Sequence, residues 1–345
     1  MKVNQFPDRI IEIDNEDYLY FGGTAYLGLP THPEFQKLLI KNILQWGTAY
    51  GSSRSANIQL TAYENGERFL ANYTKAAKVL TVSSGVLAGK LVSEVLTSQG
   101  NTFFHFPDTH PAIKTSNSLP VFIGNNLNPR LLDSATEKIT ILTDAVPSFH
   151  IKPINLSILN SIPPTKEITL VIDESHSLGI LGTNGCGIFS MIDLPVIKRK
   201  IMVASLGKAF GLTGGVIASE SDFMNQMATN DTFVSSAGMN PAFVQTMADA
   251  KQIYLQQHQK LTDNLHYVDA HLIKSKAVHF DPDYPLIYPE IKGINKIFAN
   301  NKIIVTNFKY PTDNRDLNRI VITANHKKED LDKIIHILNQ GQFGI

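Results

Sequence analysis

Lys208 is the residue with the clearest chemical potential, because it lies between two apolar runs of the chain. Ile201–Ala204 precedes it and Val216–Ala218 follows it, and each run is typical of a buried strand. A lysine between two buried strands is costly unless its charge is removed or used. One use is a Schiff base, in which a desolvated and partly neutral amine attacks a carbonyl carbon. The alternative for this segment alone is a surface lysine in a polar loop.

Asp173 and His176 form a second feature of this kind. Asp173 directly follows the apolar run Ile168–Ile172, and His176 comes three residues later. Ligands of a parallel sheet bind at the carboxyl ends of its strands, which is where this pattern places Asp173. A buried aspartate needs a partner, and a protonated pyridine nitrogen would be one.

These two features together resemble the fold-type I enzymes that use pyridoxal 5′-phosphate (PLP). The shared pattern is a strand ending in Asp-x-x-His, followed about 35 residues later by a strand ending in Ser-x-x-Lys. More narrowly, DESHSLGILGTNGCG (173–187) and ASLGKAFGLTGG (204–215) resemble the α-oxoamine synthase family. The resemblance extends from about Tyr18 to the C-terminus.

The resemblance implies the α/β fold of type I PLP-dependent transferases. In that fold a mainly parallel, seven-stranded sheet is flanked by helices and joined to a smaller α+β domain. Short buried strands alternating with helix-length segments favour the same architecture. We expect a large PLP-binding domain over 47–240 and a small domain made of 1–46 and 241–345. We also expect Val216–Ser219 to run antiparallel to its neighbours.

The family also implies a role for each residue around the PLP ring. Lys208 would hold the cofactor covalently and move protons at the substrate α-carbon. Asp173 would keep the pyridine nitrogen protonated, and His110 would stack on the ring. Ser148 and His176 would contact the ring hydroxyl. Lys208, His110, Asp173 and His176 are therefore the predicted catalytic residues.

The phosphate of the cofactor is expected at the turn Ser84-Gly85-Val86. This turn joins the predicted strand Val79–Val82 to a helix, and a helix start offers free backbone N–H groups and a positive dipole end. By resemblance, Ser205 joins this phosphate site. Ser235 and Ser236, in a segment that crosses the dimer interface in this family, would bind the phosphate of the other subunit, so we expect a homodimer.

Arg319 and Thr24 are the predicted substrate-binding residues. Arg319 begins the stretch RIVITANH, which resembles the family's Arg-Ile-x-x-Thr-Ala-x-His segment, and its guanidinium suits an α-carboxylate as a bidentate partner. A strand-edge salt bridge is the alternative role for this arginine. Thr24 stands where the family has an asparagine.

Composition limits the other possibilities. The chain has 345 residues, 43% of them hydrophobic, with 31 basic and 31 acidic side chains. Its net charge of zero gives no indication of a nucleic-acid or membrane partner. The single cysteine, Cys186, excludes an internal disulfide, and neither a signal-peptide core nor a membrane-spanning run is present, so a cytoplasmic enzyme is expected. We expect no metal, and we expect the cluster Lys198–Lys200 at the end of a helix.

The predicted reaction is acyl transfer from an acyl-CoA thioester to an amino acid, giving an aminoketone. The alternatives are a PLP-dependent aminotransferase and a non-catalytic relative, and the intact Asp173, His176 and Lys208 set argues against the second. Tyr63 replaces a family histidine, Val86 an aromatic residue and Cys186 an arginine. These departures bear on the identity of the acyl donor more than on the binding of PLP. The sequence identifies neither the amino acid nor the acyl donor.

Overall fold

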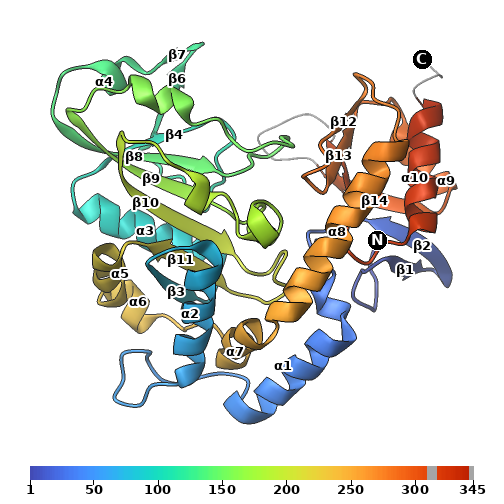
Figure 1. Cartoon of the computed structure of the whole chain (residues 1–345), viewed down its shortest axis with the longest axis horizontal. Helices are drawn as coiled ribbons and strands as arrows, with labels where there is room; N and C mark the ends of the chain where they lie inside the picture. The colour runs from blue at the N-terminus through green and yellow to red at the C-terminus, as the bar shows by residue number, and fades with distance from the viewer. Residues whose placement is uncertain (309–316, 342–345) are drawn as a thin grey trace. The chain divides into compact units, whose positions relative to one another are not determined.

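A computed structural model describes residues 1–308 and 317–341 of the chain (Figure 1). Contacts between residues divide the chain into two compact units. Unit 1 contains residues 1–35, 209–211 and 252–345, and unit 2 contains residues 36–208 and 212–251. These units change over near residues 35 and 251, whereas the sequence predicts domain boundaries after residues 46 and 240. The domain boundaries stay a prediction.

Unit 2 is built on a seven-stranded sheet of described residues. From edge to edge its strands are β3 (Lys78–Val82), β11 (Gly215–Ser219), β10 (Ile197–Ser205), β9 (Lys166–Asp173), β8 (Glu137–Asp144), β4 (Thr102–His105) and β5 (Leu119–Pro120). The pairings from β10 to β5 are parallel, whereas β11 is antiparallel to both β10 and β3. The predicted mainly parallel sheet and the antiparallel strand near residue 216 are therefore confirmed.

Side chains of these strands alternate between two hydrophobic clusters, as the two-residue period of a strand requires. Phe103 and Leu142 belong to one cluster, together with α3 (Gly85–Ser98) and α5 (Ser221–Ala228). Phe104 and Ile141 belong to the other, which includes α4 (Pro129–Leu132) and the 3₁₀ segment η2 (Ser157–Ser161). The sheet is thus buried on both faces, as expected for parallel strands.

The remaining helices connect or cover these strands. They are α1 (Pro33–Trp46), α2 (Thr61–Thr74), α6 (Asp231–Ser235), α7 (Pro241–Asp249) and the 3₁₀ turns η3 (Thr183–Gly185) and η4 (Phe189–Met191), with the hairpin β6 (Phe122–Ile123) and β7 (Asn126–Leu127) beside them. Helix α2 packs directly on α7, because a Cβ at Gly66 would lie 2.3 Å from the Val244 side chain. No helix was predicted over residues 61–74.

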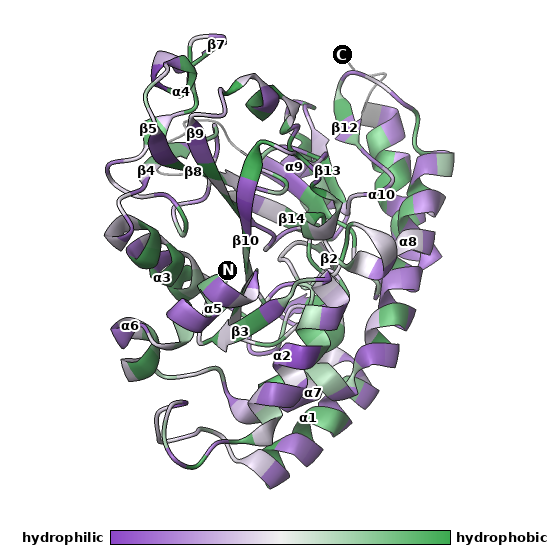
Figure 2. Cartoon of the chain, turned by 60° about the vertical axis from the view of Figure 1, so that its left-hand side comes forward, coloured by the Kyte–Doolittle hydropathy of each residue, from purple (hydrophilic) through white to green (hydrophobic). Residues whose placement is uncertain are grey.

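Unit 1 contains a six-stranded sheet. Its strand order is β1 (Ile10–Ile13), β2 (Glu16–Phe21), β14 (Ile303–Phe308), β15 (Leu317–Val321), β13 (Leu286–Pro289) and β12 (Val278–Phe280). Its helical elements are η1 (Leu29–Thr31), α8 (Lys251–His271), α9 (Ile294–Asn300) and α10 (Lys328–Gly341). Figure 2 shows both hydrophobic and hydrophilic residues along α8 and α10, as expected for helices with one buried face.

Several polar groups of unit 1 are paired with one another. Arg9 Nη2 donates to Asp330 Oδ1 over 2.8 Å, and Asn325 Nδ2 donates to Asp8 Oδ1 over 2.9 Å. His326 stacks on Phe21 with ring centroids 4.1 Å apart. Its Nδ1 accepts from the backbone N–H of Thr323 over 2.9 Å, and its Nε2 lies 3.0 Å from the carbonyl of Tyr20. Burial lowers the pKa of His326 to about 4.

One local prediction is wrong. Lys198–Lys200 lies within strand β10 instead of at a helix end. Lys200 Nζ donates to the carbonyl of Ile192 over 2.6 Å and lies 5.1 Å from the centre of the Phe189 ring, whereas Arg199 pairs with Glu220. These partners satisfy the charges locally, so a strand can carry them. Among the described residues, no helix has the length and apolar character needed to cross a bilayer.

Candidate functional site

Two acidic residues end adjacent parallel strands of unit 2. Asp173 is the last residue of β9 and Asp144 is the last residue of β8, and they are register partners in the sheet. Both are buried, with exposed fractions of 7% and 5%. Asp173 Oδ1 accepts the backbone N–H of Ser175 over 2.8 Å. The carboxyl edge of the sheet therefore holds two carboxyl groups out of water, as the sequence predicts for Asp173 alone.

Lys208 and His176 meet at the same edge. Lys208 lies in the loop between β10 and β11, and its Nζ is 2.8 Å from His176 Nε2. Both residues are half-buried. The loop is closed across its base, because the backbone N–H of Leu206 donates to the carbonyl of Gly214 over 3.0 Å. An amine in this position has a basic neighbour within proton-transfer distance.

Ser205 and Gly85 bring the start of α3 to the end of β10. A Cβ placed on Gly85 would lie 2.9 Å from Ser205 Cα, so no other residue fits there without a shift. Ser175 links this point to Asp173, because its Oγ accepts the backbone N–H of Ser205 over 2.8 Å. The first turn of a 14-residue helix thus faces a serine at a strand end, which is a suitable place for a phosphate.

His110 is anchored through its backbone. Its N–H donates to Asp144 Oδ1 over 2.9 Å, and its Nδ1 accepts the N–H of Ala112 over 3.2 Å. Partial desolvation lowers the pKa of His110, with Lys208 acting in the same direction and Asp173 opposing it. The imidazole ring is therefore near both Asp173 and Lys208, and its stacking role stays a prediction.

The other predicted cofactor residues of unit 2 occupy varied settings. Ser84 is the N-cap of α3 and its Oγ accepts the N–H of Leu87 over 3.1 Å, whereas Val86 is 54% exposed in the first turn. Ser148 is half-buried in the loop after β8. The hydroxyls of Ser235 and Ser236 donate to carbonyls of the first turn of α6, each over 2.6 Å. The roles of these residues stay predictions.

Thr24 and Arg319 belong to unit 1. Thr24 is half-buried in the segment between β2 and η1. Arg319 is half-buried in β15, where it is the register partner of Thr306 in β14. Burial raises the pKa of the Tyr20 phenol, and the charge of Arg319 opposes that change. Arg319 therefore lies near Tyr20. The substrate-binding roles of both residues stay predictions.

Sequence reasoning missed Asp144 and Glu174. Asp144 follows a buried strand just as Asp173 does, so the same signal was available. Glu174 is fully buried, and its carboxylate accepts from Ser177 Oγ and from the backbone N–H groups of Ile188 and Phe189. Burial raises the pKa of Glu174 to about 7, although these hydrogen bonds oppose the change.

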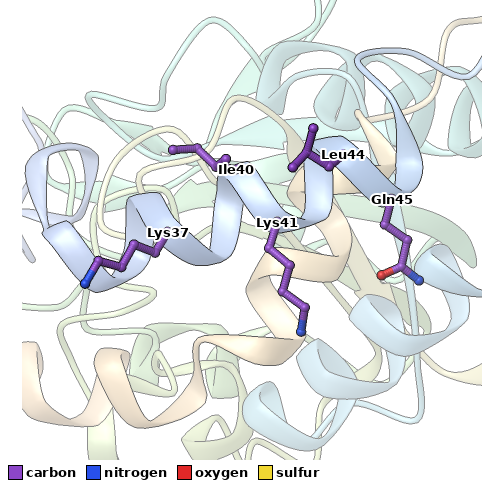
Figure 3. A pocket seen from close by; sticks show the side chains of 5 residues that line it. All are labelled: Lys37, Ile40, Lys41, Leu44 and Gln45. Atoms are coloured by element: carbon purple, nitrogen blue, oxygen red, sulfur yellow. The ribbon is translucent and has the colours of Figure 1, made fainter.

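Two hollows are lined by other residues. One runs along α1, and Figure 3 shows Ile40, Leu44 and their neighbours extending from that single helix. The other, in unit 1, includes Arg9, Tyr18 and Lys302. None of the predicted site residues lines either hollow. Within residues 1–308 and 317–341, no group of three His, Cys, Asp or Glu side chains is placed to hold a metal ion.

Comparison with known proteins places this edge in context. The family model of class I and II aminotransferases matches residues 154–338, which include Asp173, Lys208 and Arg319. An 8-amino-7-oxononanoate synthase of Thermoanaerobacter pseudethanolicus is 27% identical over 93% of this chain and 86% of its own length. A putative 8-amino-7-oxononanoate synthase of Rippkaea orientalis is 24% identical over 98% of this chain and 93% of its own length.

Solved structures share the fold. The serine palmitoyltransferase of Sphingomonas wittichii matches 99% of this chain and 92% of its own with a TM-score of 0.82, at 17% identity. An 8-amino-7-oxononanoate synthase of Francisella tularensis matches 94% of this chain and 98% of its own with a TM-score of 0.70, at 21% identity. These structures confirm the expected fold. Together with the family model and the curated relatives, they confirm the resemblance to α-oxoamine synthases.

Proposed function

The chain belongs to the aminotransferase class I and II family, and we propose that within it the protein is a PLP-dependent α-oxoamine synthase. It joins an amino acid to the acyl group of an acyl-CoA thioester and forms an aminoketone. The observation that carries this proposal is the Lys208–His176 contact of 2.8 Å beside the buried Asp173. A nucleophilic amine, a base and a buried carboxyl group at one sheet edge are the groups that PLP chemistry needs.

The residues present at this edge fit PLP. Gly85 and Ser205 form a cradle that a Cβ on Gly85 would fill, and the helix start there suits the phosphate. Asp173 is a buried carboxyl group that a pyridinium nitrogen would pair. When bound, the cofactor supplies an electron sink for the carbanion formed at the substrate α-carbon. The chain's own residues then determine where protons move.

Proton movement is assigned to Lys208 and His176. The Lys208 amine holds the cofactor at rest and, once free, takes or returns a proton at the substrate α-carbon. His176 Nε2 lies within hydrogen-bond distance of that amine and keeps it oriented. His110, whose backbone is fixed by Asp144, would stack on the ring. Arg319 orients the substrate carboxylate, and its placement decides which α-carbon bond breaks first.

The relatives at 22–27% identity named 8-amino-7-oxononanoate synthase favour that type of substrate pair. We therefore propose an 8-amino-7-oxononanoate synthase-like condensation with loss of carbon dioxide. The enzyme is proposed to be a homodimer in which Ser235 and Ser236 face the cofactor phosphate of the partner subunit. Sedimentation of a fully active monomer would exclude this arrangement.

A thiol-release assay tests the reaction class. The purified enzyme is incubated with PLP, a panel of small amino acids and acyl-CoA thioesters of different lengths, and free thiol is measured. Release that requires both an amino acid and one donor class supports the synthase.

The family match also favours an aminotransferase as the second candidate. Absence of thiol release with every donor, together with conversion of a 2-oxo acid by the pyridoxamine form of the enzyme, would identify that activity instead.

A further inference from the structure

Asp144 is a buried carboxyl group that the proposed chemistry does not use. It is 5% exposed and is the register partner of Asp173 on the neighbouring parallel strand. Register partners on adjacent strands lie side by side on one face of the sheet. Two buried carboxylates at partner positions repel each other, which favours a proton on one of them.

The surroundings indicate which of the two groups keeps the proton. Asp144 faces Asp173 on β9. Asp108, on the loop after β4, places a second negative charge near Asp144. Lys208 supplies a positive charge near Asp144. Burial and the two acids raise the pKa of Asp144 well above its usual value, although the His110 N–H and Lys208 oppose the change.

Asp144 also has a structural task at this edge. Its Oδ1 accepts the backbone N–H of His110 over 2.9 Å, and a protonated carboxyl group still accepts that bond through its carbonyl oxygen. The bond fixes the chain immediately beside the ring that the proposed function places against the cofactor. Loss of the bond would release His110, whereas loss of the charge alone would not.

We propose that Asp144 is a positioning residue that carries a proton at neutral pH, fixes His110, and leaves Asp173 to bear the only negative charge of the pair. A pyridinium nitrogen would then meet one carboxylate instead of two. The inference rests on the proposed PLP site but not on the acyl donor.

Infrared spectroscopy of the PLP-loaded enzyme tests the proton directly. Aspartate labelled with ¹³C in its side-chain carboxyl group separates aspartic acid bands from those of Glu174. We expect a labelled protonated-carboxyl band at pH 7 that disappears in Asp144→Asn and persists in the control Glu174→Gln. Absence of the band in the unsubstituted enzyme, or its persistence in Asp144→Asn, overturns the proposal. If Asp144→Asn does not fold, Asp144→Glu removes the labelled group while keeping a carboxyl group.

A second pair of variants tests the positioning role. Asp144→Ala should lower kcat by up to about a hundredfold, because a misplaced group near the reacting atoms has effects of that size. It should also shift the absorption band of the bound cofactor. Asp144→Asn should restore both, because an amide oxygen accepts the His110 N–H. Equal loss in both variants shows that the charge of Asp144 matters and overturns the proposal, whatever substrates the enzyme uses.

Discussion

The carboxyl edge of the unit 2 sheet and the polar core of unit 1 both remove ionisable side chains from water. In unit 1, Arg9 pairs with Asp330, and His326 bonds the backbone at both ring nitrogens. At the unit 2 edge, Asp144 and Asp173 are acidic residues at partner positions of adjacent strands, and Lys208 Nζ contacts His176. Oppositely charged pairs stabilise a fold, whereas like charges held together in a buried place mark a candidate ligand site.

The largest effect should come from removing the amine at this edge. Lys208→Ala is expected to abolish turnover and the PLP adduct that borohydride traps, because no other amine occupies that place beside His176. Mass spectrometry of the reduced, digested protein locates the adduct. Lys138→Ala, an exposed change in β8, serves as the control and should keep both properties. An adduct found on another lysine would exclude Lys208 as the attachment site.

A smaller effect is expected from Asp173→Asn. The amide keeps the bond from the Ser175 N–H but cannot neutralise a pyridinium charge, and a charge-assisted bond contributes about 1.5–3 kcal/mol. Turnover should therefore fall roughly 10- to 100-fold while the thermal unfolding midpoint changes little. Asp222→Asn on the exposed start of α5 is the matched control. Near-normal turnover in Asp173→Asn would contradict the pairing.

Glu174 should make unit 2 less stable as the pH rises. Its pKa is about 7 in the folded protein against an ordinary value of 4.5, so the folded state binds its proton more tightly than the unfolded state does. This contribution is complete below pH 4.5, and about 3 kcal/mol of it is lost between pH 4.5 and 7. Glu174→Gln should show a flatter decline in the urea-unfolding midpoint across that range. Equal slopes for the two proteins would refute the assignment.

His326 should act in the opposite direction in unit 1. Its pKa is about 4 when folded against an ordinary value of 6.5, so the unfolded state binds the proton more tightly. The stability from the neutral ring is complete above pH 6.5, and about 3 kcal/mol is lost as the pH falls to 4. His326→Phe keeps an aromatic ring against Phe21 and should remove this acid sensitivity. Urea unfolding at pH 7, 5.5 and 4 measures the free energy of unfolding of both proteins. An equal loss of stability toward pH 4 in the variant would contradict this role of His326.

Much of the fold followed from local patterns in the sequence. Apolar runs located the strands that end at Asp173 and Ser205, because strands buried on both faces are apolar throughout. The same runs placed Lys208 in the loop between β10 and β11. The error at Lys198–Lys200 has a different cause, since its partners Phe189, Ile192 and Glu220 become neighbours only when the chain folds.

The site was less predictable than the strands. The pairing of Asp144 with Asp173 depends on which strands are adjacent, and strand order is not encoded in the pattern of either strand. The contact between Gly85 and Ser205 joins positions 120 residues apart (205 − 85), so a small residue at a turn was the only local sign of it. Glu174 gave no signal, because its partners at residues 188 and 189 are backbone groups.

The place of β11 in the sheet has a consequence for how this protein is made. Residues 215–219 pair with β3, which was synthesised more than a hundred residues earlier, and they separate β3 from β10. The helix that follows β3 and the loop that carries Lys208 are therefore joined only when this strand inserts. Pairings so distant along the chain form slowly. On a ribosome, the nascent chain must keep β3 unpaired until residue 219 has emerged, and cofactor capture would report that this closure is complete.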